Sequence, residues 1–327
     1  AEGDILWVDG DDDACDDAGS GSSAAPFCQI QAALDDGSAE LIAVREDVSD
    51  DYAPISWVSG GSATIVAVEP GASIFQRTAT EPAVRCINGS TLTVVGMTIT
   101  GRKEGTVTGP GITTSACTLT ATDVNVSGNG GAGISATGGT VTLTDVNVSG
   151  NGGAGLVASA GADLTVRRSE FTGNEDGGLD LAGTTYLVEN SLIANNGRTG
   201  EVPPVGGVNI QATATGTFIN NTIADNRGNF VGGISCGSAA SSLVNTLVTR
   251  NVLMGSVSSN VATCTVDPSS YADDDAMLGG ADGYHLTAAS SCCVDQGTDT
   301  DAPADDIDGD ERPCGESIDI GADELCP

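Results

Sequence analysis

The chain has 327 residues, of which 46 are glycine and only 3% are aromatic. Its 11 Lys and Arg stand against 45 Asp and Glu, and this net charge of −34 excludes a conventional nucleic-acid binder and disfavours an anionic membrane surface. No run of about 18 apolar residues could span a bilayer, and a hydrophobic fraction of 39% is too high for a disordered chain. We therefore expect a folded protein without direct membrane insertion.

The N-terminal part is acidic and contains one helical pattern. The chain begins at Ala1 rather than Met and lacks an apolar signal segment, which is typical of an exported protein whose signal peptide has been removed. Residues 1–51 hold 15 of the acidic residues, and Phe27–Leu34 has apolar side chains at helical spacing. We expect an acidic N-terminal segment with a capping helix over residues 1–39.

The body, residues 40–266, is a repeat. Thr122–Ile134 and Thr144–Leu156 match almost letter for letter at an offset of 22 residues, and weaker copies follow. Each copy holds two or three short segments with period-two alternation, separated by Gly-rich turns, and none has helical periodicity. A repeat of this length predicts one coil of a parallel β-helix. The whole body is then an all-β solenoid of about nine or ten coils, with Val, Ile, Leu and Phe side chains pointing inward.

One asparagine recurs in every copy. Asparagine tolerates the left-handed backbone of tight turns, and amides stacked at one position in successive coils can bond to each other as a ladder. A row of ligand-binding amides is the functional alternative, but the structural interpretation is favoured. The predicted ladder consists of Asn129, Asn151, Asn174, Asn196, Asn226 and Asn251.

The C-terminal part, residues 267–327, loses the repeat and holds 17 acidic residues, so we expect an acidic, Cys-rich cap. An even number of cysteines in an exported protein predicts disulfides. The spacing suggests Cys15–Cys28 and Cys236–Cys264, and it pairs Cys292 and Cys293 with Cys314 and Cys326 in some order. The ten cysteines are Cys15, Cys28, Cys86, Cys117, Cys236, Cys264, Cys292, Cys293, Cys314 and Cys326.

Three patterns resemble known families. The Phe/Ile-x-x-Asn segments that alternate with Gly-Gly-Ile-like steps resemble the repeats of polymorphic outer-membrane proteins. Val8-Asp-Gly together with Pro26–Leu34 is similar to the start of right-handed β-helix proteins of the pectin-lyase-like superfamily. The ending Asp308-Gly-Asp-x-Arg312 with Asp319–Glu324 resembles the choice-of-anchor Q domain. These resemblances imply a right-handed β-helix, secreted or displayed on a bacterial surface.

Calcium is the candidate metal. Alternate carboxylates with D-x-D-x-D spacing on a turning loop can converge on one hard cation, although neither run has the bidentate Glu of an EF-hand loop. A solvated acidic surface is the simpler alternative. The candidate ligands are Asp9, Asp11 and Asp13 near the start, and Asp306, Asp308 and Asp310 near the end.

Few residues in the sequence are candidates for catalysis. A calcium-dependent polysaccharide lyase needs a basic residue beside carboxylate-held calcium. The candidate bases are Arg85, Arg102, Lys103, Arg167 and Arg168, and the candidate acids are Asp123, Asp145 and Asp180. Asp123 and Asp145 occupy the same repeat position, which is typical of turn residues. His285 is the single histidine, which disfavours Ser/His/Asp chemistry.

Threonines at alternate positions suggest a flat outward surface, which could bind ice. This function is only a minor alternative, because outward-facing Thr is common in β-strands of any function. The rows comprise Thr91 and Thr93, then Thr118, Thr120 and Thr122, then Thr140, Thr142 and Thr144.

The preferred hypothesis is a non-catalytic extracellular structural protein (a scaffold, an adhesin or a self-assembling filament subunit) without an assigned catalytic residue. The alternative is a polysaccharide-binding protein or lyase.

Overall fold

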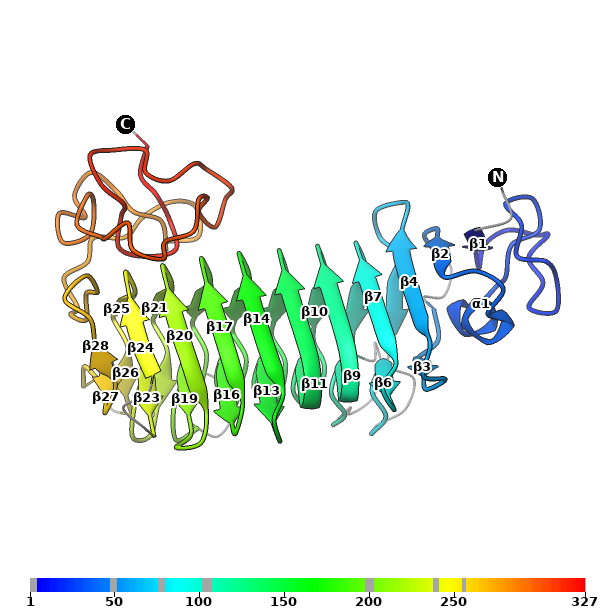
Figure 1. Ribbon diagram of the computed structural model, residues 1–327, viewed down its shortest axis with the longest axis horizontal. Helices are drawn as coiled ribbons and strands as arrows, with labels where there is room; N and C mark the ends of the chain where they lie inside the picture. Colours follow the sequence, from blue (N-terminus) through cyan, green and yellow to red (C-terminus); the bar gives the residue numbers. More distant parts are fainter. Residues whose placement is uncertain are drawn as a thin grey trace.

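A computed structural model describes residues 5–47, 52–75, 80–101, 108–197, 203–237, 241–254 and 257–326. Over these residues short parallel strands stack into a rod, with the N-terminal segment at one end and the C-terminal segment beside the other (Figure 1). A repeating coil contributes three strands, for example β13 (Leu156–Ser159), β14 (Asp163–Arg167) and β15 (Glu170–Thr172). The predicted parallel β-helix with two or three strands per repeat is therefore confirmed.

The largest sheet has 18 strands and covers two faces of the rod. β9 (Ile112–Thr122) and β11 (Ile134–Thr144) run through both faces and join them. Its other strands are β1 (Ile5–Val8), β2 (Leu41–Val44), β3 (Ile55–Trp57), β4 (Ser62–Ala67), β6 (Val84–Ile87), β7 (Thr91–Val95), β13, β14, β16 (Leu179–Ala182), β17 (Thr185–Glu189), β19 (Val208–Ile210), β20 (Thr215–Ile219), β23 (Ile234–Cys236), β24 (Ser241–Val244), β27 (Val261–Ala262) and β28 (Thr265–Val266).

The third face is an eight-stranded sheet, and a short two-stranded pairing joins β22 (Arg227–Gly228) to β26 (Val252–Leu253). Eight strands mark about eight complete turns, slightly fewer than the nine or ten that the sequence predicts, because the coils of β1 and β2 contribute no strand to this sheet. The strands are β5 (Ser73–Phe75), β8 (Thr98–Thr100), β10 (Asn125–Ser127), β12 (Asn147–Ser149), β15, β18 (Leu192–Ala194), β21 (Thr222–Ala224) and β25 (Leu247–Thr249).

The core is a set of columns in which one apolar residue from each coil lies on the next. The parallel register places the central residue of each strand in the eight-stranded sheet directly over its neighbour, and each is fully buried. Full burial of each such side chain stabilises the fold by about 1.5–3 kcal/mol. One column consists of Val126, Val148, Phe171, Ile193, Ile223 and Val248.

The repeated asparagines lie in one buried file beside this sheet. The Nδ2 of Asn151 donates to the Oδ1 of Asn174 at 2.9 Å, and the Nδ2 of Asn174 donates to the Oδ1 of Asn196 at 3.0 Å. Equivalent bonds continue the file to Asn129 at one end and through Asn226 to Asn251 at the other. Glycine leaves room for these amides: a Cβ on Gly155 would lie 2.8 Å from the Nδ2 of Asn174.

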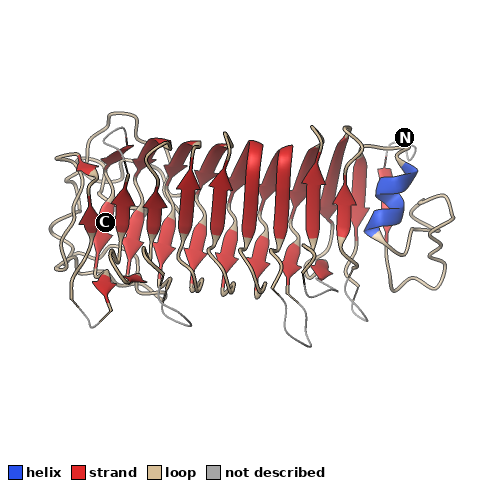
Figure 2. Ribbon diagram, turned by 90° about the horizontal axis from the view of Figure 1, so that it is seen from below, coloured by secondary structure: helices blue, strands red, loops and turns tan. Residues whose placement is uncertain are grey.

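At the N-terminal end of the rod lies α1 (Ile30–Asp36), which buries Ile30, Ala33 and Leu34 (Figure 2). Gly37, with a φ of 61°, ends the helix in the left-handed conformation that glycine adopts without strain. The N-terminal segment also contributes β1, which pairs in parallel with β2. This segment is thus a part of the solenoid as well as its cover. No helix among the described residues is long and apolar enough to cross a membrane.

The C-terminal segment forms a loop-rich module, defined here as residues 267–326, that folds back beside the last coils (Figure 1). Its small core packs Leu286, Cys293 and Ile320 against Leu247 of β25. We expected a cap over the end of the solenoid, whereas this module lies along its side. The side placement follows from the polar corner of the coils, which supplies hydrogen bonds to the module's backbone.

Corner residues from β10 onward each precede a strand of the eight-stranded sheet, and three of them, Asn190, Asn220 and Asn245, make these bonds. These residues adopt left-handed backbone, with φ values between 44° and 56°, which suits Asn and Asp. The Nδ2 of Asn245 donates to the carbonyl of Thr298 at 2.8 Å, and the Nδ2 of Asn220 donates to that of Asp319 at 3.0 Å. The corner row consists of Asp123, Asp145, Arg168, Asn190, Asn220 and Asn245.

Five disulfides connect all ten cysteines. The suggested pairs Cys15–Cys28 and Cys236–Cys264 are present, and Cys86–Cys117 joins neighbouring coils. The suggested pairing of Cys292 and Cys293 with the last two cysteines is wrong, because Cys292 bonds to Cys293 and Cys314 bonds to Cys326. The buried ion pair between Arg312 and Glu324 folds the end of the chain back on itself, which brings the last two cysteines together.

Candidate functional site

An open groove of about 610 Å³ runs over the outer face of the eight-stranded sheet. Its floor carries Thr98, Asn125 and Asn147, which are in register on β8, β10 and β12. Glu170 of β15 continues the same row toward the C-terminal module. The strand spacing of roughly 4.8 Å sets the step between these side chains. The groove thus presents one polar group per coil at regular intervals.

Two walls bound this floor. At the N-terminal end, residues 67–71, which include Glu69, project beside β8. Along one side stand the exposed corner residues Asp123 and Asp145, with φ values of 54° and 56°. Their left-handed backbone supports the interpretation of these two aspartates as turn residues. Their position also directs carboxylates along the groove, so the turn and binding roles are compatible.

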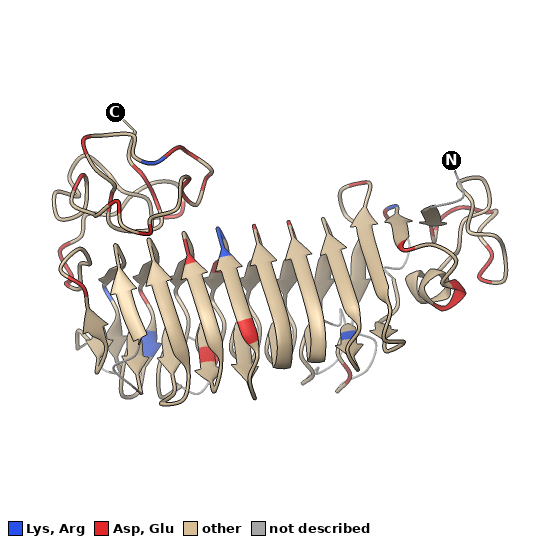
Figure 3. Cartoon of the chain, in the orientation of Figure 1, with Lys and Arg blue, Asp and Glu red and all other residues tan. Residues whose placement is uncertain are grey.

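Acidic side chains dominate the electrostatics of the groove. Three carboxylates line it, whereas most other acidic residues of the chain lie in the N-terminal segment and the C-terminal module, as Figure 3 shows. Arg168 lies at the next corner, and its Nε and Nη2 donate to the two oxygens of Asp145 at 2.8 and 3.0 Å. A second ion pair joins Arg168 to Asp305 of the C-terminal module.

This double pairing holds a proton on Arg168. The hydrogen bond that Arg168 donates to Asp145 raises the pKa of the guanidinium above its already high ordinary value, and Asp305 adds to the effect. An arginine acts as a base only when its pKa falls, so the carboxylates oppose that role. In this arrangement Arg168 is a structural cation that links the coil corner to the C-terminal module.

The structure places the other residues of the lyase hypothesis apart. Arg167 pairs with Glu189 at 2.8 Å, and Arg85 pairs with Glu81 at 2.7 Å. Asp180 lies on β16, in the 18-stranded sheet, and accepts hydrogen bonds from Asn209 and Gln211. Of the candidate acids, Asp123 and Asp145 line the groove. The candidates Arg102 and Lys103 lie outside the described residues.

The first predicted calcium run is on the surface of the N-terminal segment. Asp9 accepts a hydrogen bond from the backbone of Asp11 at 3.2 Å and pairs with Arg45 at 3.1 Å. Asp11 and Asp13 are exposed. Calcium at this run stays a prediction.

The second run divides between two roles. Asp306 is fully buried, and its carboxylate accepts the backbone N–H groups of Asp308, Asp310 and Glu324. Asp308 instead turns toward His285, and its Oδ2 lies 2.8 Å from the Nε2 of that ring. The Asp306 carboxylate therefore stabilises the turn by accepting backbone hydrogen bonds, whereas the Asp308 carboxylate contacts the imidazole of His285. Calcium held jointly by the three residues also stays a prediction.

The threonine rows lie on the 18-stranded sheet, away from the groove. Thr93 pairs with Thr120, and Thr120 pairs with Thr142. Thr91, Thr118 and Thr140 form a second row in the same register. These rows are regular over three coils, and Asp163 and Leu187 interrupt them further along. Ice binding by this surface stays a prediction.

Sequence reasoning missed the floor of the groove. Asn125 and Asn147 stand at one position of the two near-identical repeats, inside the alternating segment Val-Asn-Val. Their neighbours Val124 and Val126 point inward, so alternation indicates that the asparagines point outward. That signal was available. What the sequence could not show is that residues 67–71 and the C-terminal module flank this face.

A family model and one solved structure agree with this architecture. Residues 110–270 match a family model described as a right handed beta helix region. The crystal structure of the pectate lyase Pel9A is similar with a TM-score of 0.55 and 15% identity, over 99% of this chain and 97% of that chain. The enzymatically active domain of bacteriophage CBA120 tailspike protein 2 matches with a TM-score of 0.38 and 12% identity, over 74% of this chain and 44% of that chain.

No curated protein matches the chain. The resemblances to polymorphic outer-membrane-protein repeats and to the choice-of-anchor Q domain stay predictions. In the structure the latter motif forms the buried pair of Arg312 and Glu324 and the turn at Asp306. From the stacked parallel coils, the family model and the likeness to the fold of a pectate lyase, we conclude that the chain folds as a parallel β-helix, right-handed over the residues that the family model matches.

Proposed function

We propose that this protein is a non-catalytic extracellular rod, an adhesin or scaffold, that binds a polysaccharide chain along its groove. The observation that carries the proposal is the row of Thr98, Asn125 and Asn147, one polar side chain per coil, in an open groove. The strand spacing of roughly 4.8 Å is close to the length of one pyranose unit in an extended glycan. An extended chain can therefore present successive hydroxyl groups to successive coils.

The side chains of the groove suit hydroxyl groups. An amide both donates and accepts hydrogen bonds, a threonine hydroxyl does the same, and a carboxylate accepts. Asn125 and Asn147 are exposed in the free protein, so a glycan would replace water on these groups without breaking bonds of the fold. The three carboxylates of the groove repel a polyanion, which favours a neutral glycan as the ligand.

Five disulfides support an extracellular location, because disulfides persist in oxidising compartments. Export with removal of a signal peptide and display on a bacterial surface are parts of the proposal. Binding at such a surface would use the rod as a rigid support, since stacked coils place the groove residues at fixed separations.

A calcium-dependent lyase for acidic polysaccharides is the second candidate, favoured by the proximity of Asp123, Asp145 and Arg168 on adjacent corners. In β-elimination a base removes the C5 proton of a uronate, the C4–oxygen bond breaks, and the leaving oxygen takes a proton. Calcium on the two aspartates would weaken their hold on Arg168 and neutralise the uronate. The ion pairs of Arg168 with Asp145 and Asp305 weigh against this candidate.

A binding titration separates the two candidates. Isothermal titration with neutral and acidic polysaccharides, each with calcium and with a chelator, should give binding to a neutral glycan that does not require calcium. The double variant Asn125→Ala/Asn147→Ala should weaken this binding at least tenfold. Thr120→Ala/Thr142→Ala on the 18-stranded sheet is the matched control and should change nothing.

The outcomes that contradict the proposal are equally specific. Equal weakening by both double variants would remove the groove as the binding site. Ultraviolet absorbance from unsaturated uronate ends, formed only with calcium and lost in Arg168→Gln, would establish the lyase instead. The absence of binding across the neutral panel would reject the proposed ligand class.

A further inference from the structure

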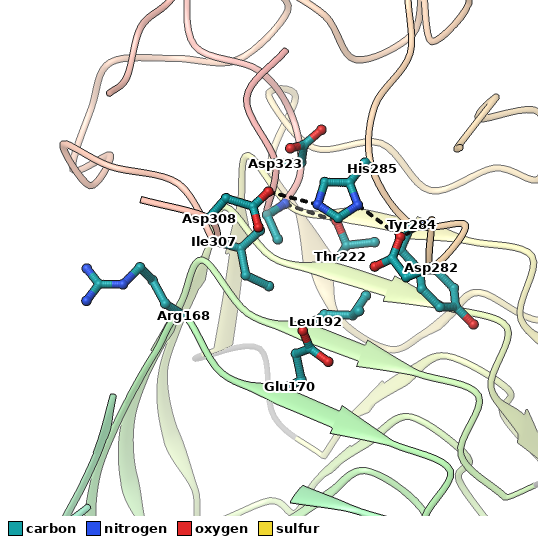
Figure 4. Close-up of a pocket in the computed structure, with 11 residues that line it drawn as sticks. Arg168, Glu170, Leu192, Thr222, Asp282, Tyr284, His285, Ile307, Asp308 and Asp323 are labelled. Atoms are coloured by element: carbon teal, nitrogen blue, oxygen red, sulfur yellow. Dashed lines mark hydrogen bonds and ion pairs between the residues drawn. The ribbon is translucent and has the colours of Figure 1, made fainter. Parts of the chain in front are cut away.

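A second, smaller cavity of about 70 Å³ lies between the C-terminal module and the eight-stranded sheet. The sheet supplies Glu170, Leu192 and Thr222 to its lining, and the module supplies His285 and three aspartates (Figure 4). Glu170 and His285, which both line this cavity, are more than a hundred residues apart in the chain. The cavity is distinct from the glycan groove, although Glu170 continues the row of its floor.

His285 lies between two carboxylates in this cavity. Its Nδ1 is 2.9 Å from the Oδ1 of Asp282, and its Nε2 is 2.8 Å from the Oδ2 of Asp308. Asp323 is buried beside them, and one ligand atom each from His285, Asp308 and Asp323 lie within 4.8 Å of one another. Ligands bound to one zinc ion at about 2.0–2.2 Å lie roughly 3 Å apart. Only a small contraction separates these atoms from that geometry.

The hydrogen bond to Asp282 is what a metal-ligating histidine needs. An N–H at Nδ1 that donates to a carboxylate fixes the ring orientation and leaves Nε2 for a metal. Asp282 provides that partner, whereas Nε2 lies at hydrogen-bond distance, 2.8 Å, from Asp308, a contact that a metal held by both groups would replace. The arrangement therefore separates an outer carboxylate, Asp282, from the inner group of His285, Asp308 and Asp323.

The cavity also carries more negative than positive charge. Four carboxylates, those of Glu170, Asp282, Asp308 and Asp323, surround one imidazole, and Arg168 at the rim is already paired with Asp145 and Asp305. Among the described residues none donates a hydrogen bond to the side chain of Glu170, which points into the cavity (Figure 4). A bound cation would compensate this excess.

We propose that His285, Asp308 and Asp323 bind a zinc-class divalent cation at the cavity between the C-terminal module and the solenoid. Imidazole is a common ligand of zinc and its neighbours, whereas calcium takes oxygen ligands in sets of six to eight. The proposal therefore differs from calcium at the run of Asp306, Asp308 and Asp310, and it does not depend on glycan binding.

The test uses the full chain after treatment with a chelator. Titration with zinc chloride should give one site per chain, and cobalt should give a visible absorption band of a low-coordinate site. His285→Gln and Asp323→Asn should each weaken zinc binding at least tenfold, and Asp282→Asn should weaken it about 10- to 100-fold. Asp310→Asn, an exposed acid of the same segment, is the matched control and should bind zinc unchanged.

Three results would overturn the proposal: no zinc binding, equal binding by His285→Gln and the unchanged chain, or displacement of zinc by equimolar calcium. Circular dichroism shows whether each variant is folded, and the cobalt spectrum reports the ligands directly. Glycan binding should persist in His285→Gln, so a failure of this proposal and a failure of the proposed function would be distinguishable.

Discussion

The asparagine ladder predicts a large and position-dependent loss of stability when one amide is removed. Asn174 is fully buried in the middle of the file, and its side chain takes part in four hydrogen bonds. In Asn174→Ala the backbone N–H of Asn151 loses its partner, which costs about 1–3 kcal/mol, and the three other bonds contribute about 1 kcal/mol each. We expect a total loss of about 4–6 kcal/mol in the free energy of unfolding.

Asn129 provides the matched control because it ends the file. Its Nδ2 donates to Asn151 at 3.0 Å, but its own Oδ1 has no partner among the described residues. Asn129→Ala removes this unsatisfied acceptor together with the bond to Asn151 and two longer bonds to the carbonyls of Ser127 and Ile99, and it leaves no backbone N–H of the described residues without its acceptor, so we expect a loss of only about 1–2 kcal/mol. Guanidinium unfolding followed by circular dichroism measures both variants. Equal shifts of the two midpoints would refute the idea that the amides act as a continuous ladder.

Two further predictions concern charged groups. Arg312→Met should cost about 3–5 kcal/mol because it leaves the Glu324 carboxylate buried without its counter-ion, and the double variant Arg312→Met/Glu324→Leu should recover part of that loss in urea unfolding; no recovery would contradict the pairing. Burial raises the pKa of Glu189, with Arg167 opposing, so stability linked to this carboxyl is present below about pH 4.5 and lost as the pH rises through the higher folded pKa. Glu189→Gln should flatten the fall of the unfolding midpoint just above pH 4.5, and an unchanged slope would show that another group is responsible.

The solenoid could be predicted because its sequence repeats. Near-identity between Thr122–Ile134 and Thr144–Leu156 imposes one backbone path on both segments, and an asparagine that recurs once in every copy predicts that these amides stack. The alternation of apolar and polar residues along each strand likewise predicts which side chains point into the core. Local rules were sufficient here because each coil contacts mainly its neighbours.

The C-terminal module could not be predicted in this way, because its contacts join residues far apart in the chain. Asn245 meets Thr298, and Asn190 meets Asp305, although no repeat or spacing connects these positions. The same limit explains the incorrect disulfide pairing, which depended on spacing alone. It also explains why His285 looks isolated in the sequence. Its carboxylate partners converge on it only after the module folds.

The groove is the central claim, and a crystal structure with a bound oligosaccharide tests it most directly. We expect electron density for sugar rings along Thr98, Asn125 and Asn147, with hydroxyl groups at hydrogen-bond distance from the two amides. Density on another face of the rod, in crystals where this groove is open to solvent, would contradict the account.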